Sequence, residues 1–152
     1  MTAATHKPNV VRATWVGEHR FDTGRVDGPV ARLDGSGHTG QSPPDALLSA
    51  LAACSGIDLV NILAKRRTPV ERLTIETEGM RRDASPRRFT QMRITYRLDG
   101  PGIEAAHAER AVALAFEKYC SVAASLAPDT SVETTVIVNG VTGAVLVQAM
   151  GR

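Results

Sequence analysis

The sequence predicts one globular domain with an α+β fold, from the order of its elements, its length and its composition. The predicted order is strands, one long helix, two strands, a second helix and one or two last strands, so helices and strands alternate only in part. The chain has 152 residues, which is the size of one domain, and we expect a single domain over residues 1–152 in which residues 1–8 form a flexible tail. Its 43% hydrophobic and 22% charged residues are ordinary for a globular protein whose core needs neither disulfide nor metal.

The first third of the chain is expected to form short strands. Residues 10–16 alternate weakly and contain Thr14 and Trp15, which favour a strand. Residues 21–34 are interrupted by glycine and proline and predict one or two further strands with turns. The glycine-rich residues 35–40 predict a loop, and no Lys-Ser or Lys-Thr pair follows them as a phosphate-binding loop would require.

A long helix is the clearest prediction. Ser42 is suited to cap its N-terminus, with proline in the first turn and the Asp45 carboxylate at the third helical position. The helix can extend to about Arg67, with Gly56 as its one unfavourable residue at a cost of about 1 kcal/mol. Residues 46–57 are apolar nearly all round, which predicts a buried central helix. One small sheet is too little to cover it, so the helix also indicates a dimer.

The remaining elements follow from alternation and from turn residues. Strands are expected around residues 73–77 and 91–98, because apolar side chains alternate there with polar ones. Other segments are a loop at 81–88, a helix at 103–118, a short helix at 121–126, a strand at 131–138 and a last strand within 143–149.

Composition and motifs exclude several classes of function. Eighteen basic and sixteen acidic residues leave a formal charge of +2, too weak for a nucleic acid or an anionic membrane as the main partner. Residues 1–8 lack a secretory signal, and the longest apolar stretch is too short to span a bilayer, so we expect a cytoplasmic protein with free or cycling thiols. The four histidines lack metal-ligand spacing and GxSxG does not occur, so no metal or cofactor is expected.

The two cysteines are the strongest candidates for chemistry. Cys54 lies mid-helix among small residues, where it is either a small core residue or a thiol that another group can approach closely. Cys120 lies where two helical segments meet, and backbone N–H groups of the second segment are placed to stabilise a thiolate. The cysteines are 66 positions apart, so no CxxC motif exists and the fold decides whether they meet.

Helix geometry separates two nearby acids. At about 100° per residue, Asp58 lies about 40° from Cys54 and one turn further on, so the two share a face. Asp45 lies about 180° from Cys54 and fits the N-terminal cap instead. A carboxylate beside a thiol raises the pKa of that thiol unless an arginine bridges the two groups, which leaves the role of Asp58 open.

Two segments resemble the OsmC/Ohr family. They are residues 42–55, SPPDALLSALAACS, and residues 118–122, KYCSV, and the spacing of the cysteines fits as well. With residues 54–60 and 85–90, the sequence is most similar to the YhfA-like branch, and the resemblance covers residues 14–138. It implies antiparallel sheets around two long cysteine-bearing helices, in an intertwined homodimer with its active sites at the interface.

The resemblance also implies an activity and a role for each thiol. The activity is thiol-dependent reduction of organic hydroperoxides or peroxide in oxidative-stress defence. Cys54 would attack the O–O bond and become a sulfenic acid, and Cys120 would condense with it to a disulfide that a dithiol reductant reopens. The hydroperoxidase branches carry a glutamate ten residues before the first cysteine, paired to an arginine. Here that position is Pro44, and Arg20 and Arg25 are the candidates for the arginine.

Two other functions stay open. The Pro44 departure and the apolar helix also suit a non-peroxidase dimer that binds a small apolar or thiol-containing ligand in its interface pocket. A structural redox staple would form the disulfide without turning over a substrate.

Overall fold

The computed structural model describes residues 6–149, which form two compact units that divide after Leu47. Each unit is described by itself. Most of the expected tail, residues 1–5, lies outside the described residues, and residues 6–8 have no regular secondary structure. The expectation of a single domain stays a prediction.

The first unit contains a three-stranded antiparallel sheet, as the turn residues indicate. Its strands are β1 (Val11–Trp15), β2 (Arg20–Arg25) and β3 (Ala31–Asp34), in the order β1-β2-β3. The glycine-rich loop follows β3. The Asp34 carboxylate, 2% exposed, accepts hydrogen bonds from the backbone N–H groups of Ser36 at 2.9 Å and Thr39 at 3.0 Å. The loop is therefore held by one buried carboxylate.

The long helix α1 (Pro43–Lys65) begins where the sequence predicts. The backbone N–H of Asp45 donates to the Ser42 side-chain oxygen at 3.2 Å, which is the expected N-terminal cap. The expectation that this helix is buried on all sides is wrong for the single chain, because one sheet covers only one face of the helix. Ile57 on the other side is 61% exposed. Gly56 lies against β4, where an added Cβ would come within 2.6 Å of the Ile75 side chain.

The second unit is built on a five-stranded sheet. Its strands are β4 (Arg72–Arg81), β5 (Phe89–Asp99), β6 (Ser131–Val138), β7 (Val141–Thr142) and β8 (Leu146–Gln148). The order is β4-β5-β6-β7, and β8 pairs with β6 as well. As the alternation predicts, Met92, Ile94, Tyr96 and Leu98 of β5 are buried at 1% exposure or less.

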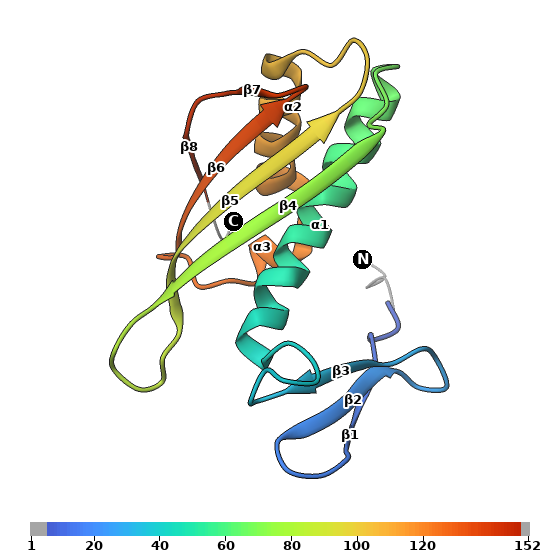
Figure 1. Cartoon of the computed structure of the whole chain (residues 1–152), viewed down its shortest axis with the longest axis vertical. Helices are drawn as coiled ribbons and strands as arrows, with labels where there is room; N and C mark the ends of the chain where they lie inside the picture. The colour runs from blue at the N-terminus through green and yellow to red at the C-terminus, as the bar shows by residue number, and fades with distance from the viewer. Residues whose placement is uncertain (1–5, 150–152) are drawn as a thin grey trace, which may run out of the picture. The chain divides into compact units, whose positions relative to one another are not determined.

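The expectation of purely antiparallel sheets is wrong for one strand pair. β5 and β6 run parallel, with Gln91 opposite Ser131 and Leu98 opposite Val138. A parallel pair needs a crossover connection, and the second helical region supplies it. It consists of α2 (Ala105–Leu114), the π-helical turn η1 (Ala115–Tyr119) and α3 (Ser121–Ala124). Figure 1 shows α2 beside α1 on one face of the β4-β5-β6 sheet.

The expectation of two long cysteine-bearing helices is met by one helix only. Cys54 lies within α1, whereas Cys120 lies in extended backbone between η1 and α3, with φ −76° and ψ 102°. The helix predicted over residues 103–118 becomes π-helical at residue 115, and this turn carries the chain to Cys120.

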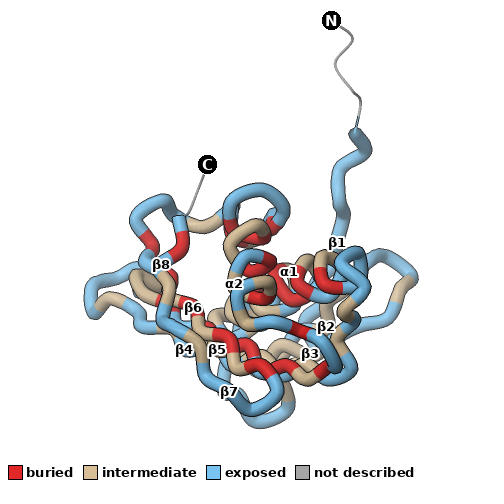
Figure 2. Tube along the Cα trace, turned by 90° about the horizontal axis from the view of Figure 1, so that it is seen from above, coloured by how far each residue is buried: buried red, intermediate tan, exposed pale blue. Residues whose placement is uncertain are grey.

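The core of the second unit lies between its sheet and its helices. Figure 2 shows buried segments on α1, α2, β5 and β6, with exposed connections around them. Within the described residues, α1 is the one helix that is long and apolar enough by composition to cross a membrane, a test that the core helices of globular proteins also pass. Only 28% of its apolar window is buried inside this chain.

Candidate functional site

The fold brings the two cysteines close together. Cys54 is half-buried in the middle of α1, and Cys120 is 3% exposed at the start of α3. Cys54 lies near enough to raise the pKa of Cys120, and both are free thiols. Two residues that lie 66 positions apart in the sequence therefore form one dithiol site.

The environment of Cys120 favours its protonated form. Its pKa is raised from 9.0 to about 11, mainly by burial and to a smaller extent by the adjoining Cys54. The backbone N–H of Ala123 does donate to Cys120 Sγ at 3.4 Å, which lowers the pKa as the helix junction suggests. The expected backbone donor is therefore in place, but burial outweighs its hydrogen bond. Cys120 is a thiol at neutral pH.

A buried tyrosine lies beside the dithiol site. Tyr96 of β5 is fully buried, and its hydroxyl lies 2.7 Å from the Ser55 hydroxyl. Because Ser55 Oγ donates to the Leu51 carbonyl oxygen at 2.9 Å, the Tyr96 O–H donates to Ser55. Burial raises the pKa of Tyr96, and the charges of Cys120 and Asp58 add to that rise, so both groups lie near its hydroxyl.

Sequence reasoning missed Tyr96 and Ser55 as members of the site. One signal was available: Tyr96 stands in the inward-facing register of β5, and a buried tyrosine hydroxyl usually finds a hydrogen-bond partner. The partner itself comes from α1, 41 positions earlier, and no local pattern specifies it.

Asp58 extends the site one helical turn beyond Cys54. It is half-buried, and its Oδ2 is buried without a hydrogen-bond partner among the described residues. Burial raises its pKa. No described ion pair joins this carboxylate to an arginine, so the bridging that would offset its effect on a thiol is absent from the described contacts.

The other candidate residues belong to the first unit. Arg20 forms an ion pair with Glu18 at 3.6 Å, and its Nε is buried without a partner among the described residues. Arg25 is exposed at the end of β2. Asp45 and Pro44 lie in the first turn of α1. Whether either arginine supports Cys54 stays a prediction.

A pocket of about 510 Å³ opens between α1 and α2. At one end lie Asp58 and Tyr119, the residue next to Cys120, and at the other end lie Lys65, Arg66 and His107. Ile62, Ala111 and Leu114 form apolar walls between them. Over residues 6–149, no group of three or more histidine, cysteine or acidic side chains is placed to hold a metal ion.

The fold and the site together identify the chain as an α+β protein with a pair of neighbouring thiols. One thiol lies in the central helix and the other at a helix junction. The model of the family "OsmC-like protein" matches residues 35–135, which include both cysteines. Protein YhfA of Escherichia coli K12 is 37% identical over 116 residues, which cover 76% of this chain and 87% of that protein. The chain belongs to the OsmC-like family.

Solved structures agree with this assignment. The crystal structure of a hypothetical protein from Aquifex aeolicus matches with a TM-score of 0.78 and 29% identity, over 88% of this chain and 98% of that one. The organic hydroperoxide resistance protein OhrB of Bacillus subtilis shares the fold, with a TM-score of 0.54 and 17% identity over 86% of this chain and 98% of that one.

Proposed function

We propose that this protein is a thiol-dependent peroxidase that reduces organic hydroperoxides or peroxide in the cytoplasm, as part of oxidative-stress defence. The proximity of Cys54 and Cys120 carries the proposal, because a sulfenic acid formed on one thiol would have the other thiol beside it. The fold shared with an organic hydroperoxide resistance protein supports the choice of substrate.

The two thiols take different roles because their surroundings differ. Cys54, the more exposed thiol, attacks the O–O bond as a thiolate; the distal oxygen becomes Cys54–SOH, and the other oxygen leaves with a proton as an alcohol. The Cys120 sulfur then attacks the Cys54 sulfur, and water leaves as the disulfide forms. A dithiol reductant supplies two electrons and two protons, which restore both thiols and leave the reductant as a disulfide.

Arg20 or Arg25 is proposed to support the Cys54 thiolate. A cation near a thiolate stabilises its charge. The unpartnered Arg20 Nε makes Arg20 the stronger candidate, because a buried donor without an acceptor is costly. Pro44 stands where the hydroperoxidase branches carry a glutamate, so this arginine would lack that carboxylate partner.

A homodimer is proposed because α1 leaves an apolar face uncovered in the single chain. Ile57 is 61% exposed and Val60 is 38% exposed, and both line an apolar groove of about 560 Å³ with Leu73 and Ile75 of β4. A second copy would cover this groove. Sedimentation analysis tests the dimer, with Ile57→Glu expected to shift the chain toward monomer; a monomeric wild type would contradict it.

Steady-state turnover tests the peroxidase. Cumene hydroperoxide is the substrate and dithiothreitol the reductant, and the rates are compared with free thiol at the same concentration. We expect Cys54→Ser to abolish turnover. Cys120→Ser should retain the first, single-turnover step, because it keeps the attacking thiol. A wild-type rate no faster than free thiol, or an unchanged rate in Cys54→Ser, would contradict the proposal.

A second candidate is a non-peroxidase dimer that binds a small apolar or thiol-containing ligand. The apolar-walled pocket beside the dithiol site and the proline at position 44 favour it. A redox staple, the third reading, would form the Cys54–Cys120 disulfide without turnover. The turnover assay distinguishes the peroxidase from both alternatives. The oxidation state of the two cysteines after peroxide treatment then distinguishes the ligand-binding dimer from the redox staple.

A further inference from the structure

The pocket between α1 and α2 has an uneven distribution of charge. Lys65 and Arg66 lie at its far end, at the C-terminus of α1, and Arg110 joins them from α2. Arg110 is paired with Glu117 at 3.0 Å. No ion pair with a carboxylate is found for Lys65 or Arg66 within the described part of the chain. The far end of the pocket therefore holds two cations that no acid among residues 6–149 neutralises.

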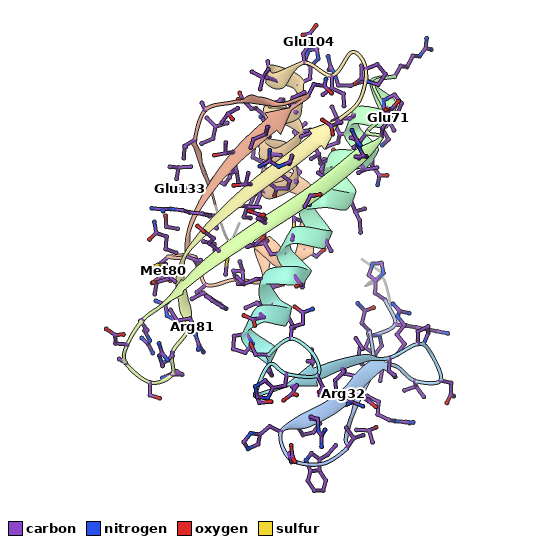
Figure 3. All side chains as sticks on the ribbon, in the orientation of Figure 1. Arg32, Glu71, Met80, Arg81, Glu104 and Glu133 are labelled. Atoms are coloured by element: carbon purple, nitrogen blue, oxygen red, sulfur yellow. The ribbon has the colours of Figure 1, made fainter. Side chains whose placement is uncertain are left out.

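Arg66 is held in place from α2. Its Nη2 lies 2.7 Å from His107 Nε2, and since a guanidinium can only donate, Nε2 accepts this hydrogen bond. The proton of this ring then lies on Nδ1, which faces Glu104 Oε2 at 3.7 Å. Figure 3 labels Glu104 at the start of α2. This chain of contacts orients one guanidinium before any ligand arrives.

The rest of the pocket suits an apolar group. Ile62, Ala111 and Leu114 line it between the cations and the end where Asp58 and Tyr119 lie. From Asp58 to Lys65 the helix rises about 10 Å, so the pocket extends from beside the dithiol site to the cationic end. A ligand that fills it needs an apolar body and one anionic end.

We propose that Lys65 and Arg66, with Arg66 oriented by His107, bind the carboxylate or phosphate group of a short amphipathic ligand whose apolar part extends along α1 toward Cys54 and Cys120. The link to the cysteines rests on the proposed function. Anion binding does not, because it needs no redox step. Both anions present oxygen acceptors that an arginine can contact with two parallel hydrogen bonds, so the geometry serves either.

The test is a ligand titration of the reduced, full-length protein without peroxide, followed by amide chemical shifts. The probes are hexyl phosphate, hexanoate and 1-hexanol, which share an alkyl chain and differ in the head group. We expect at least one anionic probe to bind about 10-fold or more tightly than hexanol, with shifts in residues 58–66 and 107–114 and weaker binding as salt rises. The tighter anion identifies the source as a phosphate or a carboxylate.

The double substitution Lys65→Gln with Arg66→Gln should remove the preference for the anion and leave hexanol binding unchanged. The control is Arg72→Gln with Arg97→Gln, which removes the same net charge from exposed positions on β4 and β5 outside the pocket. Equal affinity for hexanol and both anions would overturn the inference, and so would an unchanged preference in the pocket variant. Because the titration contains no peroxide, a negative result for ligand binding would not contradict the peroxidase proposal. Equally, a lack of turnover would not contradict ligand binding in the titration.

Discussion

Alkylation should modify Cys54 well before Cys120. The perturbation is iodoacetamide at about pH 7, which reacts with the thiolate form of cysteine. The pKa of Cys120 rises from 9.0 to about 11, mainly because the thiol is buried. Each pKa unit lowers the thiolate fraction about tenfold, so ionisation alone slows Cys120 roughly 100-fold relative to an ordinary thiol. Its 3% exposure slows it further.

The assay is timed alkylation followed by tryptic digestion and mass spectrometry. The two cysteines fall in different peptides, because Lys65 and Lys118 lie between them. Protein unfolded in guanidinium chloride is the control, and there the two rates should be similar. Equal rates for Cys54 and Cys120 in the folded protein would refute the reasoning from burial.

The Cys54→Ser variant refines this test. The neighbouring Cys54 also raises the pKa of Cys120, though less than burial does. The midpoint of Cys120 alkylation against pH should therefore fall in the variant while staying above 9.0. A midpoint that does not move would show that the neighbouring thiol has no influence.

The same pKa makes the stability of the fold depend on alkaline pH. Between 9.0 and about 11 the unfolded chain has released the Cys120 proton and the folded chain has not, so stability falls as pH rises through this window. The loss from this group is at most about 3 kcal/mol. Cys120→Ala should lose less stability than wild type over the same range in denaturant titrations.

Three further predictions concern other residues. Tyr96→Phe leaves the buried Ser55 hydroxyl with one partner fewer and should lower the free energy of unfolding by roughly 1 kcal/mol, while peroxide oxidation of the cysteines persists. Gly79→Ala places a Cβ within 2.5 Å of the Phe89 ring and should cost roughly 1–3 kcal/mol in a denaturant titration; unchanged stability would show that the ring moves freely. Asp34→Asn should lower the free energy of unfolding, because the carboxylate accepts four hydrogen bonds. These bonds hold the pKa of Asp34 below its usual range, so wild-type stability should fall as pH drops below that range, and the variant should lack this part of the fall.

Local sequence patterns were enough to predict most of the helices and strands. The cap at Ser42 places the start of α1, the alternation along β5 identifies its buried face, and residues 131–138 form β6 over the predicted range. In each case the signal lies within neighbouring residues, where backbone preference and side-chain periodicity act directly.

Local patterns could not predict how distant segments pair. Nothing local states that β5 and β6 run parallel, or that the helix after residue 114 changes to a π-helical turn before Cys120. β7 has only two residues, too few for a periodicity. The exposure of Ile57 follows from how much of α1 one sheet can cover, which is a tertiary property.

The candidate site also has a part that the sequence predicts and a part that only the fold shows. Both cysteines were visible in the sequence, and their meeting was implied by family resemblance rather than by spacing. The pKa of Cys120 could not be predicted, because two opposed effects act on it and only burial in the fold shows which is larger. The cationic end of the pocket combines α1 and α2, so it exists only once these helices pack together.

The central claim is that Cys54 and Cys120 form one redox site. The most direct measurement is peptide mass spectrometry after one equivalent of cumene hydroperoxide, with the wild type and each cysteine-to-serine variant in parallel. The account predicts a Cys54–Cys120 disulfide in the wild type, a sulfenic acid on Cys54 that a dimedone trap captures in Cys120→Ser, and no oxidation of Cys120 in Cys54→Ser. Two unmodified thiols in the wild type, or oxidation that begins on Cys120, would contradict it.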